Sequence, residues 1–438
     1  MVLRLAFSLT SVLSFAAAES VLDVVDIAPV WSGHPVSFCL LTHLDRQFVA
    51  FYDANRQATV AARALDSHEW QFQKLDERVA WDSHNYLTMA VDDAGCLHLS
   101  GNMHCVPIVY FRTSQPLDVT TFARIPSMVG QNESEATYPS FMRGASNELL
   151  FTYRDGKSGD GNQIYNVYDL ETRTWRRLLD QPLTSGEGQM NAYFNGPLRG
   201  PDGRFHLCWV WRDTGGCQTN HDLSYARSSD LVHWETSAGE PVALPMTLTT
   251  AEIVDPVPAG GGIINGNARL GFDSKNRVVI SYHKFDADGN TQIYNARREE
   301  DGWKIYPITD WKYRWEFSGG GSIHFEIRVG SVGVHDEGHL AQSWSHDTYG
   351  SGIFLLDEAT MKPVGEVEKK ASYPKEVSGV QSTFEGMQVR WAGDLGSSGE
   401  AGVRYSLRWE TLGPNRDHPR EGELPEPTML RVYKFGQP

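Results

Sequence analysis

Two histidines bracket a short predicted hairpin in the first quarter of the chain. His84 lies just before one apolar, β-rich run, and His104 lies just after a second run that ends at Ser100. The turn residues Asp92–Gly95 separate the two runs, so we expect two antiparallel strands. The start of the first strand and the end of the second then share one edge of the sheet. The two imidazoles are therefore predicted to be neighbours, and imidazoles can donate or accept protons near neutral pH.

Further polar side chains gather at the same edge if the rest of the chain repeats this hairpin around an axis. First-strand starts and second-strand ends would then share one face. These positions carry His, Asn, Arg and Tyr, whereas ordinary surface loops offer mostly Lys, Glu and Ser. The candidate site residues on this face, besides the two histidines, are Asn85, Tyr138, Arg154, Asn191, Arg212, His221 and His283.

This set of side chains suits β-elimination at a uronic acid. In that reaction the substrate carboxylate is neutralised, a base removes the proton on the adjacent carbon, and an acid protonates the leaving glycosidic oxygen. Arg, Asn or protonated His can fill the first role, and His or Tyr can fill the other two. Two isolated carboxylates between aromatic residues, the usual pattern of a glycosidase, are less prominent. The residues alone leave open whether His104 or Tyr138 acts as the base.

The elements that would position these residues recur along the chain. A β-rich run, a loop, a second β-rich run and a tryptophan follow one another several times, with the tryptophans at Trp70, Trp175, Trp234 and Trp303. About seven such units are present. Four-stranded units repeated at this period are typical of a β-propeller. We expect an all-β, seven-bladed β-propeller in one domain over residues 19–438, with each tryptophan packed between neighbouring sheets. The alternative is a pair of stacked β-sandwiches, which would not explain the constant order within each unit.

Five segments resemble one known family. They are Asp82–Asn85, Asn102–His104, Thr137–Phe141, Tyr153–Gly156, and Thr219–Asp222 followed by Tyr225–Arg227. Their order and spacing are similar to those of the BNR-repeat-containing polysaccharide lyases, which include propeller-type ulvan lyases and fungal rhamnosyl-glucuronate lyases. The resemblance covers nearly the whole chain after residue 18.

The resemblance implies a seven-bladed propeller that cleaves next to a glucuronate or iduronate by elimination. It also implies roles for individual residues. His104 would be the principal acid or base and Tyr138 the second proton-transfer group. Arg154 would neutralise the substrate carboxylate, assisted by His84 and Asn85, and Asn220 and His221 would lie in the substrate cleft.

Composition and the first residues of the chain limit the partners and the location. The formal net charge of −16 argues against nucleic acid, which requires a basic face. Residues 1–18 combine an early arginine, a short apolar run and three alanines, so we expect a secretory signal peptide and an extracellular protein. No segment is long enough to span a bilayer. We expect an anionic, uronate-containing polysaccharide or oligosaccharide as the partner, and a monomer.

The chemistry needs no cofactor, although a structural metal ion is an open possibility. Cys217 and His221 have a spacing compatible with half of a zinc site, but no second paired motif supports it. The five cysteines are an odd number, and Cys39, Cys96 and Cys208 lie in apolar strand patterns typical of buried free thiols.

Two other functions fit a propeller. One is a glycoside hydrolase of the sialidase type, because Ser228–Trp234 is similar to a degenerate Asp-box. That motif marks the scaffold more than the activity. The other is a non-catalytic sugar-binding propeller, which would carry an equivalent pocket in each unit. The polar residues here differ between units, which favours a single central site.

Overall fold

The structure is a computed structural model that describes residues 19–369 and 371–437. The expected signal peptide, residues 1–18, lies outside the described residues, so secretion stays a prediction. Within the part of the chain that the structure describes, no helix is long and apolar enough to cross a bilayer.

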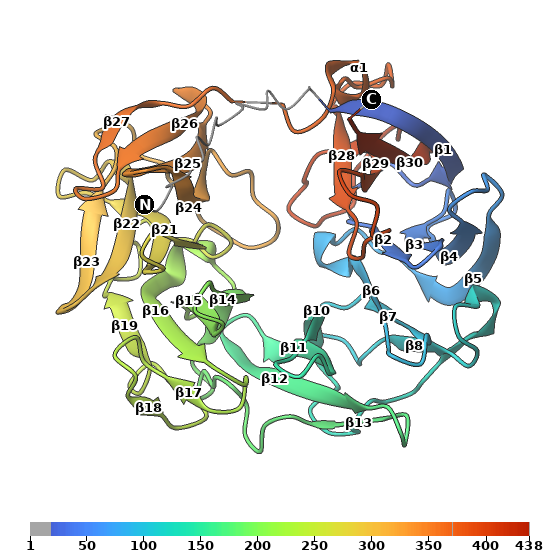
Figure 1. Ribbon diagram of the computed structural model, residues 1–438, viewed down its shortest axis with the longest axis horizontal. Helices are drawn as coiled ribbons and strands as arrows, with labels where there is room; N and C mark the ends of the chain where they lie inside the picture. Colours follow the sequence, from blue (N-terminus) through green and yellow to red (C-terminus); the bar gives the residue numbers. More distant parts are fainter. Residues whose placement is uncertain (1–18, 370, 438) are drawn as a thin grey trace, which may run out of the picture.

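Seven antiparallel sheets are arranged around a central axis (Figure 1), which agrees with the number of predicted units. The first strand of each sheet lies nearest the axis. The first three sheets are β2 (Cys39–His43), β3 (Arg46–Tyr52), β4 (Gln57–Ala64) and β5 (Gln71–Arg78); β6 (Leu87–Val91), β7 (Leu97–Gly101), β8 (Tyr110–Thr113) and β9 (Phe122–Arg124); and β10 (Ala136–Arg143), β11 (Leu149–Lys157), β12 (Asp160–Asp169) and β13 (Thr174–Arg177).

The fourth sheet is larger than the others, because β19 adds to β16 beside the main strand order. The fourth, fifth and sixth sheets are β14 (Asn191–Arg199), β15 (Phe205–Arg212), β16 (Asn220–Ser228), β17 (Trp234–Glu235), β18 (Pro241–Val242) and β19 (Glu252–Asp255); β20 (Arg269–Phe272), β21 (Val278–Phe285), β22 (Thr291–Glu299) and β23 (Gly302–Pro307); and β24 (Ile327–Asp336), β25 (His339–His346), β26 (Gly350–Asp357) and β27 (Pro363–Glu366).

The seventh sheet joins the two ends of the described chain. Its strands are β28 (Met387–Gly393), β29 (Arg404–Leu412), β30 (Thr428–Gly436) and β1 (Ser20–Val30). β1 pairs antiparallel with β30 from Ser20 opposite Gly436 to Val30 opposite Thr428. The repeat pattern did not predict this outer strand. The few helical elements are η1 (Ser83–Asn85), η2 (Val119–Thr121), η3 (Cys217–Thr219) and α1 (Lys375–Ser378).

Buried aliphatic and aromatic side chains fill the space between neighbouring sheets. One cluster runs without interruption from the seventh sheet through the first and second to the third. Trp175 on β13 packs edge-on against His98 of the second sheet, with ring centroids 5.7 Å apart. Trp175 therefore packs between neighbouring sheets as predicted. The arrangement of seven sheets around one axis excludes a pair of stacked sandwiches. All five cysteines are free, and Cys39, Cys96 and Cys208 are buried as expected.

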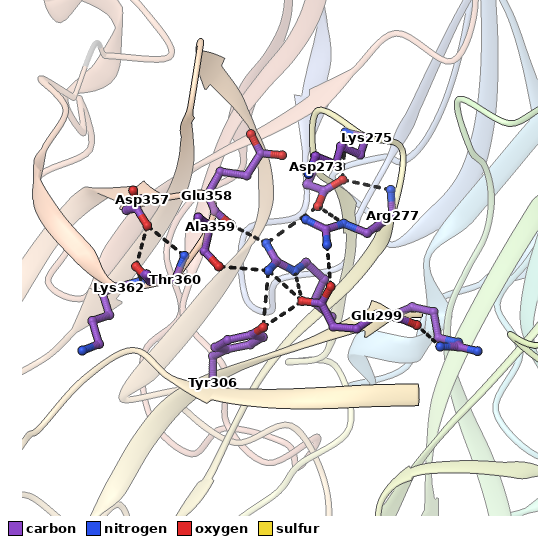
Figure 2. A network of polar contacts seen from close by, with 12 residues as sticks. Asp273, Lys275, Arg277, Glu299, Tyr306, Asp357, Glu358, Ala359, Thr360 and Lys362 are labelled. Atoms are coloured by element: carbon purple, nitrogen blue, oxygen red, sulfur yellow. Dashed lines mark hydrogen bonds and ion pairs between the residues drawn. The ribbon is translucent and has the colours of Figure 1, made fainter. Parts of the chain in front are cut away.

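A polar network, in contrast, joins the fifth and sixth sheets. Arg297 on β22 donates to Glu299 of its own strand and to the main-chain carbonyls of Glu358 and Ala359, which follow β26. Figure 2 shows these acceptors together with Asp273 and Tyr306. The network lies where β22 and β26 end, on the face of the propeller opposite the first-strand starts.

Candidate functional site

His84 and His104 lie against each other and share one carboxylate. Their rings are stacked with centroids 4.0 Å apart. Asp82 accepts a hydrogen bond from Nδ1 of His84 at 2.6 Å and another from Nδ1 of His104 at 2.5 Å. All three side chains are partly exposed, with 21–32% of each side chain accessible to solvent. The predicted neighbourhood of the two imidazoles is therefore present, and the Nε2 atoms are left for other partners.

The local chain geometry explains this pairing. Asp82 caps η1 by accepting from the backbone N–H of His84 at 2.8 Å, so the same carboxylate fixes both the turn and the ring. His104 follows β7 in a tight connection, where Asn102 and Cys105 both have positive φ, 56° and 53°. Residues other than glycine adopt positive φ at a cost in free energy, and such strain is concentrated at functional sites.

The shared carboxylate sets the charge of His104. Burial alone would lower the pKa of His104, but the hydrogen bonds with Asp82 and Cys105 raise it to about 9. Burial acts in the opposite direction on Asp82, whose pKa the two histidines hold well below its usual range. At neutral pH the geometry therefore favours a carboxylate–imidazolium pair, which is the state that an Asp–His dyad stabilises when the imidazole accepts a proton.

Tyr138 lies beside the histidine pair in a strained backbone conformation. Its ring centroid is 5.4 Å from that of His84. The residue has φ 58° and sits in an irregularity of β10, between the paired residues Thr137 and Ser140. Burial, and then the neighbouring Tyr193, raise the pKa of Tyr138 well above its usual value, although Arg154 and Arg212 oppose this. The phenol is therefore protonated over the physiological range and can serve as an acid.

Arg154 lies directly beneath this phenol and is almost fully buried. Its guanidinium carbon is 5.1 Å from the Tyr138 ring centroid. It donates to Thr137 Oγ1 at 3.0 Å, to Cys105 Sγ at 3.2 Å and to Tyr193 Oη at 3.5 Å. Within residues 19–369 and 371–437 no carboxylate pairs with it, and its Nε has no hydrogen-bond partner. A buried cation without a counter-ion is costly, which makes this position favourable for an anion.

Arg154 also affects the neighbouring thiol. Burial would raise the pKa of Cys105, but His104 and Arg154 lower it below its ordinary value.

The positive character extends into the fourth sheet. Arg212 ends β15 and contacts the Tyr193 ring with its guanidinium carbon 5.5 Å from the centroid. It donates to main-chain carbonyls of Thr214 and Gly215 and to Asn265, and it too has no carboxylate partner among the described residues. Tyr138, Tyr193 and Asn265 line a cavity of about 370 Å³. Neither guanidinium lines this cavity, but each lies against a tyrosine that does: Arg154 against Tyr138 and Arg212 against Tyr193.

Asn191 and Asn85 are buried at the edges of this group. Asn191 faces Arg212 across the β14–β15 ladder, and its amide nitrogen has no partner. Asn85 is buried in η1, and its carbonyl accepts from Tyr52 Oη at 2.6 Å. Both lie near the site, but no contact in the structure assigns them a task, so their roles in substrate binding stay predictions.

Three predicted residues are held by their own surroundings instead of joining the histidine pair. Asn220 is fully buried, donates to the carbonyl of Cys217 and exchanges hydrogen bonds with Asn265. His221 lies between two aspartates, at 2.9 Å from Asp213 and 2.7 Å from Asp222. His283 is buried against Trp315, and burial lowers its pKa to about 4. Substrate contact by these residues stays a prediction.

The metal prediction has a different location in the structure. Within the described chain, His221 pairs with aspartates while Cys217 packs among apolar side chains, so they form no paired site. The group that could hold an ion is Asp82, His84 and His104, whose ligand atoms lie within 4.8 Å of one another. Hydrogen bonds already join these three side chains to one another. Treatment with a chelator is therefore the test for a metal here.

Sequence reasoning missed several residues of this site. Asp82 belongs to the Asp82–Asn85 motif, but the sequence reasoning assigns it no role. Its spacing of two residues from His84, in a predicted turn, is a signal for a capping carboxylate. Thr137 and Cys105 had no such signal, because their importance comes from contact with Arg154 across the sheet.

Comparisons with known proteins agree with this architecture. A solved polysaccharide lyase, Uly1, matches with a TM-score of 0.62 at 12% identity over 95% of this chain and 99% of that chain. A PL25 ulvan lyase matches with a TM-score of 0.60 at 13% identity over 94% of this chain and 95% of that chain. These likenesses concern the fold. No curated protein sequence matches the chain. The family described as "BNR repeat-containing family member" matches residues 46–311, and the chain therefore belongs to the BNR repeat-containing family.

Proposed function

We propose that the protein is a secreted polysaccharide lyase that cleaves beside a glucuronate or iduronate by β-elimination, with a rhamnose–glucuronate linkage as the expected target. The observation that carries the proposal is the group formed by the His84–His104 pair, the Tyr138 phenol and the unpaired guanidinium of Arg154. These side chains would offer a substrate a proton acceptor, a proton donor and a positive charge on one face of the propeller.

His104 is suited to be the base. Asp82 holds its Nδ1, so the ring is oriented and the imidazolium that forms on proton uptake is stabilised. In the reaction the C–H bond next to the carboxylate breaks, a C=C bond forms, and the bond to the glycosidic oxygen breaks. The proton passes to Nε2 of His104 in its neutral form, which becomes abundant as the pH passes through about 9. A base with a raised pKa is strong enough to take a weakly acidic carbon-bound proton.

Tyr138 is suited to be the acid. Its neutral phenol can give a proton to the departing oxygen, and the nearby guanidinium of Arg154 stabilises the phenolate that remains. The same positive field favours the uronate carboxylate and the negative charge that develops beside it. Arg154 itself is only 1% exposed in the structure, so it acts from beneath Tyr138 unless substrate binding uncovers it.

The relatives support the class of reaction. Solved structures with this fold include polysaccharide lyases, and one PL25 ulvan lyase structure is bound to -[GlcA(1-4)Rha3S]-. That ligand contains the uronate that an elimination requires. Because the identities are 12–13%, the substrate of this chain has to be found by experiment.

The test is a product analysis on a panel of uronate-bearing polysaccharides, with and without a chelator. Elimination leaves a conjugated unsaturated uronate that absorbs ultraviolet light, and the product masses add up to the mass of the substrate. A sialidase-type hydrolase would instead add one water for each bond cleaved, and a sugar-binding propeller would bind without product. Either result would overturn the proposal. Loss of activity with the chelator would show that the protein needs a metal ion, for which Asp82, His84 and His104 are the candidate ligands.

A further inference from the structure

A loop from the seventh sheet reaches across to the histidine pair. We call residues 413–427, which connect β29 to β30, the strap. Arg416 of the strap donates to the carbonyl of Ser318 at 3.0 Å, in the connection between the fifth and sixth sheets. The next residue, Asp417, has φ 60° and turns its carboxylate toward the second sheet. The strap therefore touches two separate parts of the ring.

Asp417 is the centre of these contacts. Its carboxylate accepts from the backbone N–H and the hydroxyl of Ser83, at 3.0 and 2.8 Å. It also accepts from the backbone N–H and the hydroxyl of Ser322, at 2.7 and 3.0 Å. Nε2 of the buried His34 is 3.3 Å away. Only 9% of the Asp417 side chain is exposed. Burial alone would raise the pKa of the carboxyl, but His34 and Ser83 hold it well below its usual range.

These contacts fix the turn that carries His84. η1 is only three residues long, and so short a 3₁₀ turn has little stability of its own. Asp82 caps the turn from within, whereas Asp417 holds its first residue, Ser83, from a segment 334 positions away in sequence. Oδ2 of Asp417 is also 3.8 Å from Nδ1 of His84. The place of the His84 ring over His104 thus depends on two carboxylates, and only one of them is local.

We propose that Asp417 is a positioning residue of the site: by anchoring Ser83 it holds His84 against His104 and Tyr138, so the site is complete only when the strap from the last sheet is docked. The effect on catalysis rests on the lyase function proposed above. Displacing a reacting group by about 1 Å can cost on the order of 100-fold in rate.

The experiment compares Asp417→Asn and Asp417→Ala with the wild-type protein. The matched control is Asp230→Asn. Asp230 also accepts backbone N–H groups within a turn, but that turn follows β16 on the opposite face. We expect both Asp417 variants to lose about 10- to 100-fold in kcat with little change in KM, whereas the control keeps the wild-type kcat. Asp417→Asn retains the shape of the side chain and keeps the test valid if Asp417→Ala does not fold.

A second measurement does not depend on lyase activity. Histidine modification by diethyl pyrocarbonate, followed by peptide mass spectrometry, reports how firmly His84 is held. We expect His84 to react several-fold faster in Asp417→Asn than in wild type, with the exposed His68 unchanged as an internal reference. If His84 reacts faster but no uronate polymer yields a product with the wild-type protein, the positioning role stands and the lyase proposal falls. An unchanged kcat or an unchanged His84 reactivity in a folded Asp417→Asn protein would overturn the positioning role.

Discussion

Arg154 and Arg297 are buried to the same degree, at 1% and 2% exposure, but their partners differ. Arg297 is surrounded by Glu299, Asp273, Tyr306 and two main-chain carbonyls (Figure 2). Burial alone would lower its pKa, but Glu299 and Tyr306 raise it. Among the described residues, Arg154 has hydroxyl and sulfur acceptors but no carboxylate: Thr137, Cys105 and Tyr193.

The two guanidiniums also lie on opposite faces of the propeller. Arg154 is near the end of a second strand, β11, and Arg297 near the end of a third strand, β22. Acids balance the charge of Arg297, whose network joins the fifth and sixth sheets. In the part of the chain that the structure describes, no acid balances the charge of Arg154, which lies near the histidine pair. A buried arginine therefore stabilises the fold where acids surround it, and it remains available for an anion where they do not.

The largest expected effect is at His104, the proposed base. His104→Ala should lower kcat by about 10²- to 10⁴-fold, because it removes proton transfer while leaving the sheets intact. Steady-state rates on the best uronate polymer measure this, with His233→Ala, an exposed histidine on the opposite face, as the control. A near-normal rate in the His104 variant would exclude it from the mechanism.

The next largest effect separates the two arginines by stability. Arg297→Leu should destabilise the protein by about 3–5 kcal/mol, because it leaves the carbonyls of Glu358 and Ala359 without this donor and removes one of the two arginines that pair with Glu299. Denaturant unfolding measures the change. Asp26→Asn, which removes an exposed ion pair with Arg431, should cost about 0–1 kcal/mol and serves as the control. Equal costs in the two variants would show that the Figure 2 network does not hold the fifth and sixth sheets together.

Arg154→Met should do the reverse. Removing an unpaired buried charge should leave the unfolding free energy unchanged or raise it, since no acid loses a partner. The rate on free uronates should fall by about 10²- to 10³-fold, the range seen when one stabilising donor is removed from an active site. Substrates with esterified carboxyl groups should be affected far less. Destabilisation as large as that of Arg297→Leu would make Arg154 a structural residue and remove the contrast.

The sequence predicts the repeated sheets well, because each hairpin is local: two β-rich runs, turn residues and a tryptophan lie within a few dozen positions. It does not predict β1, whose partner β30 is about 400 residues away and whose acidic residues Asp23 and Asp26 interrupt the apolar pattern. Sequence reasoning also places His84, His104, Tyr138 and Arg154 on one face. It cannot show that Arg154 lacks a counter-ion or that Asp417 reaches Ser83, because both depend on contacts between distant segments.

The smallest expected effect is the pH dependence of the unfolding free energy that His104 contributes on the face that carries Arg154. Its pKa is raised from 6.5 to about 9 in the folded protein, so its contribution to stability is complete below pH 6.5 and is lost as the pH rises through about 9. Because 32% of the side chain is exposed, we expect a loss on the order of 1–2 kcal/mol between pH 7 and about 9.5. Unfolding in denaturant at several pH values measures it, and His104→Ala should show a flatter profile.

The same titration predicts the rate profile. If His104 is the base, kcat/KM should rise as the pH passes through about 9, because the neutral imidazole of the free protein becomes abundant as the stabilising charge disappears. The reaction would then become faster over the same pH range in which the protein becomes less stable. Arg297→Leu, on the opposite face, should leave the pH dependence of the rate unaltered. A rate that falls through the same range would instead make His104 the acid and transfer proton abstraction to another group.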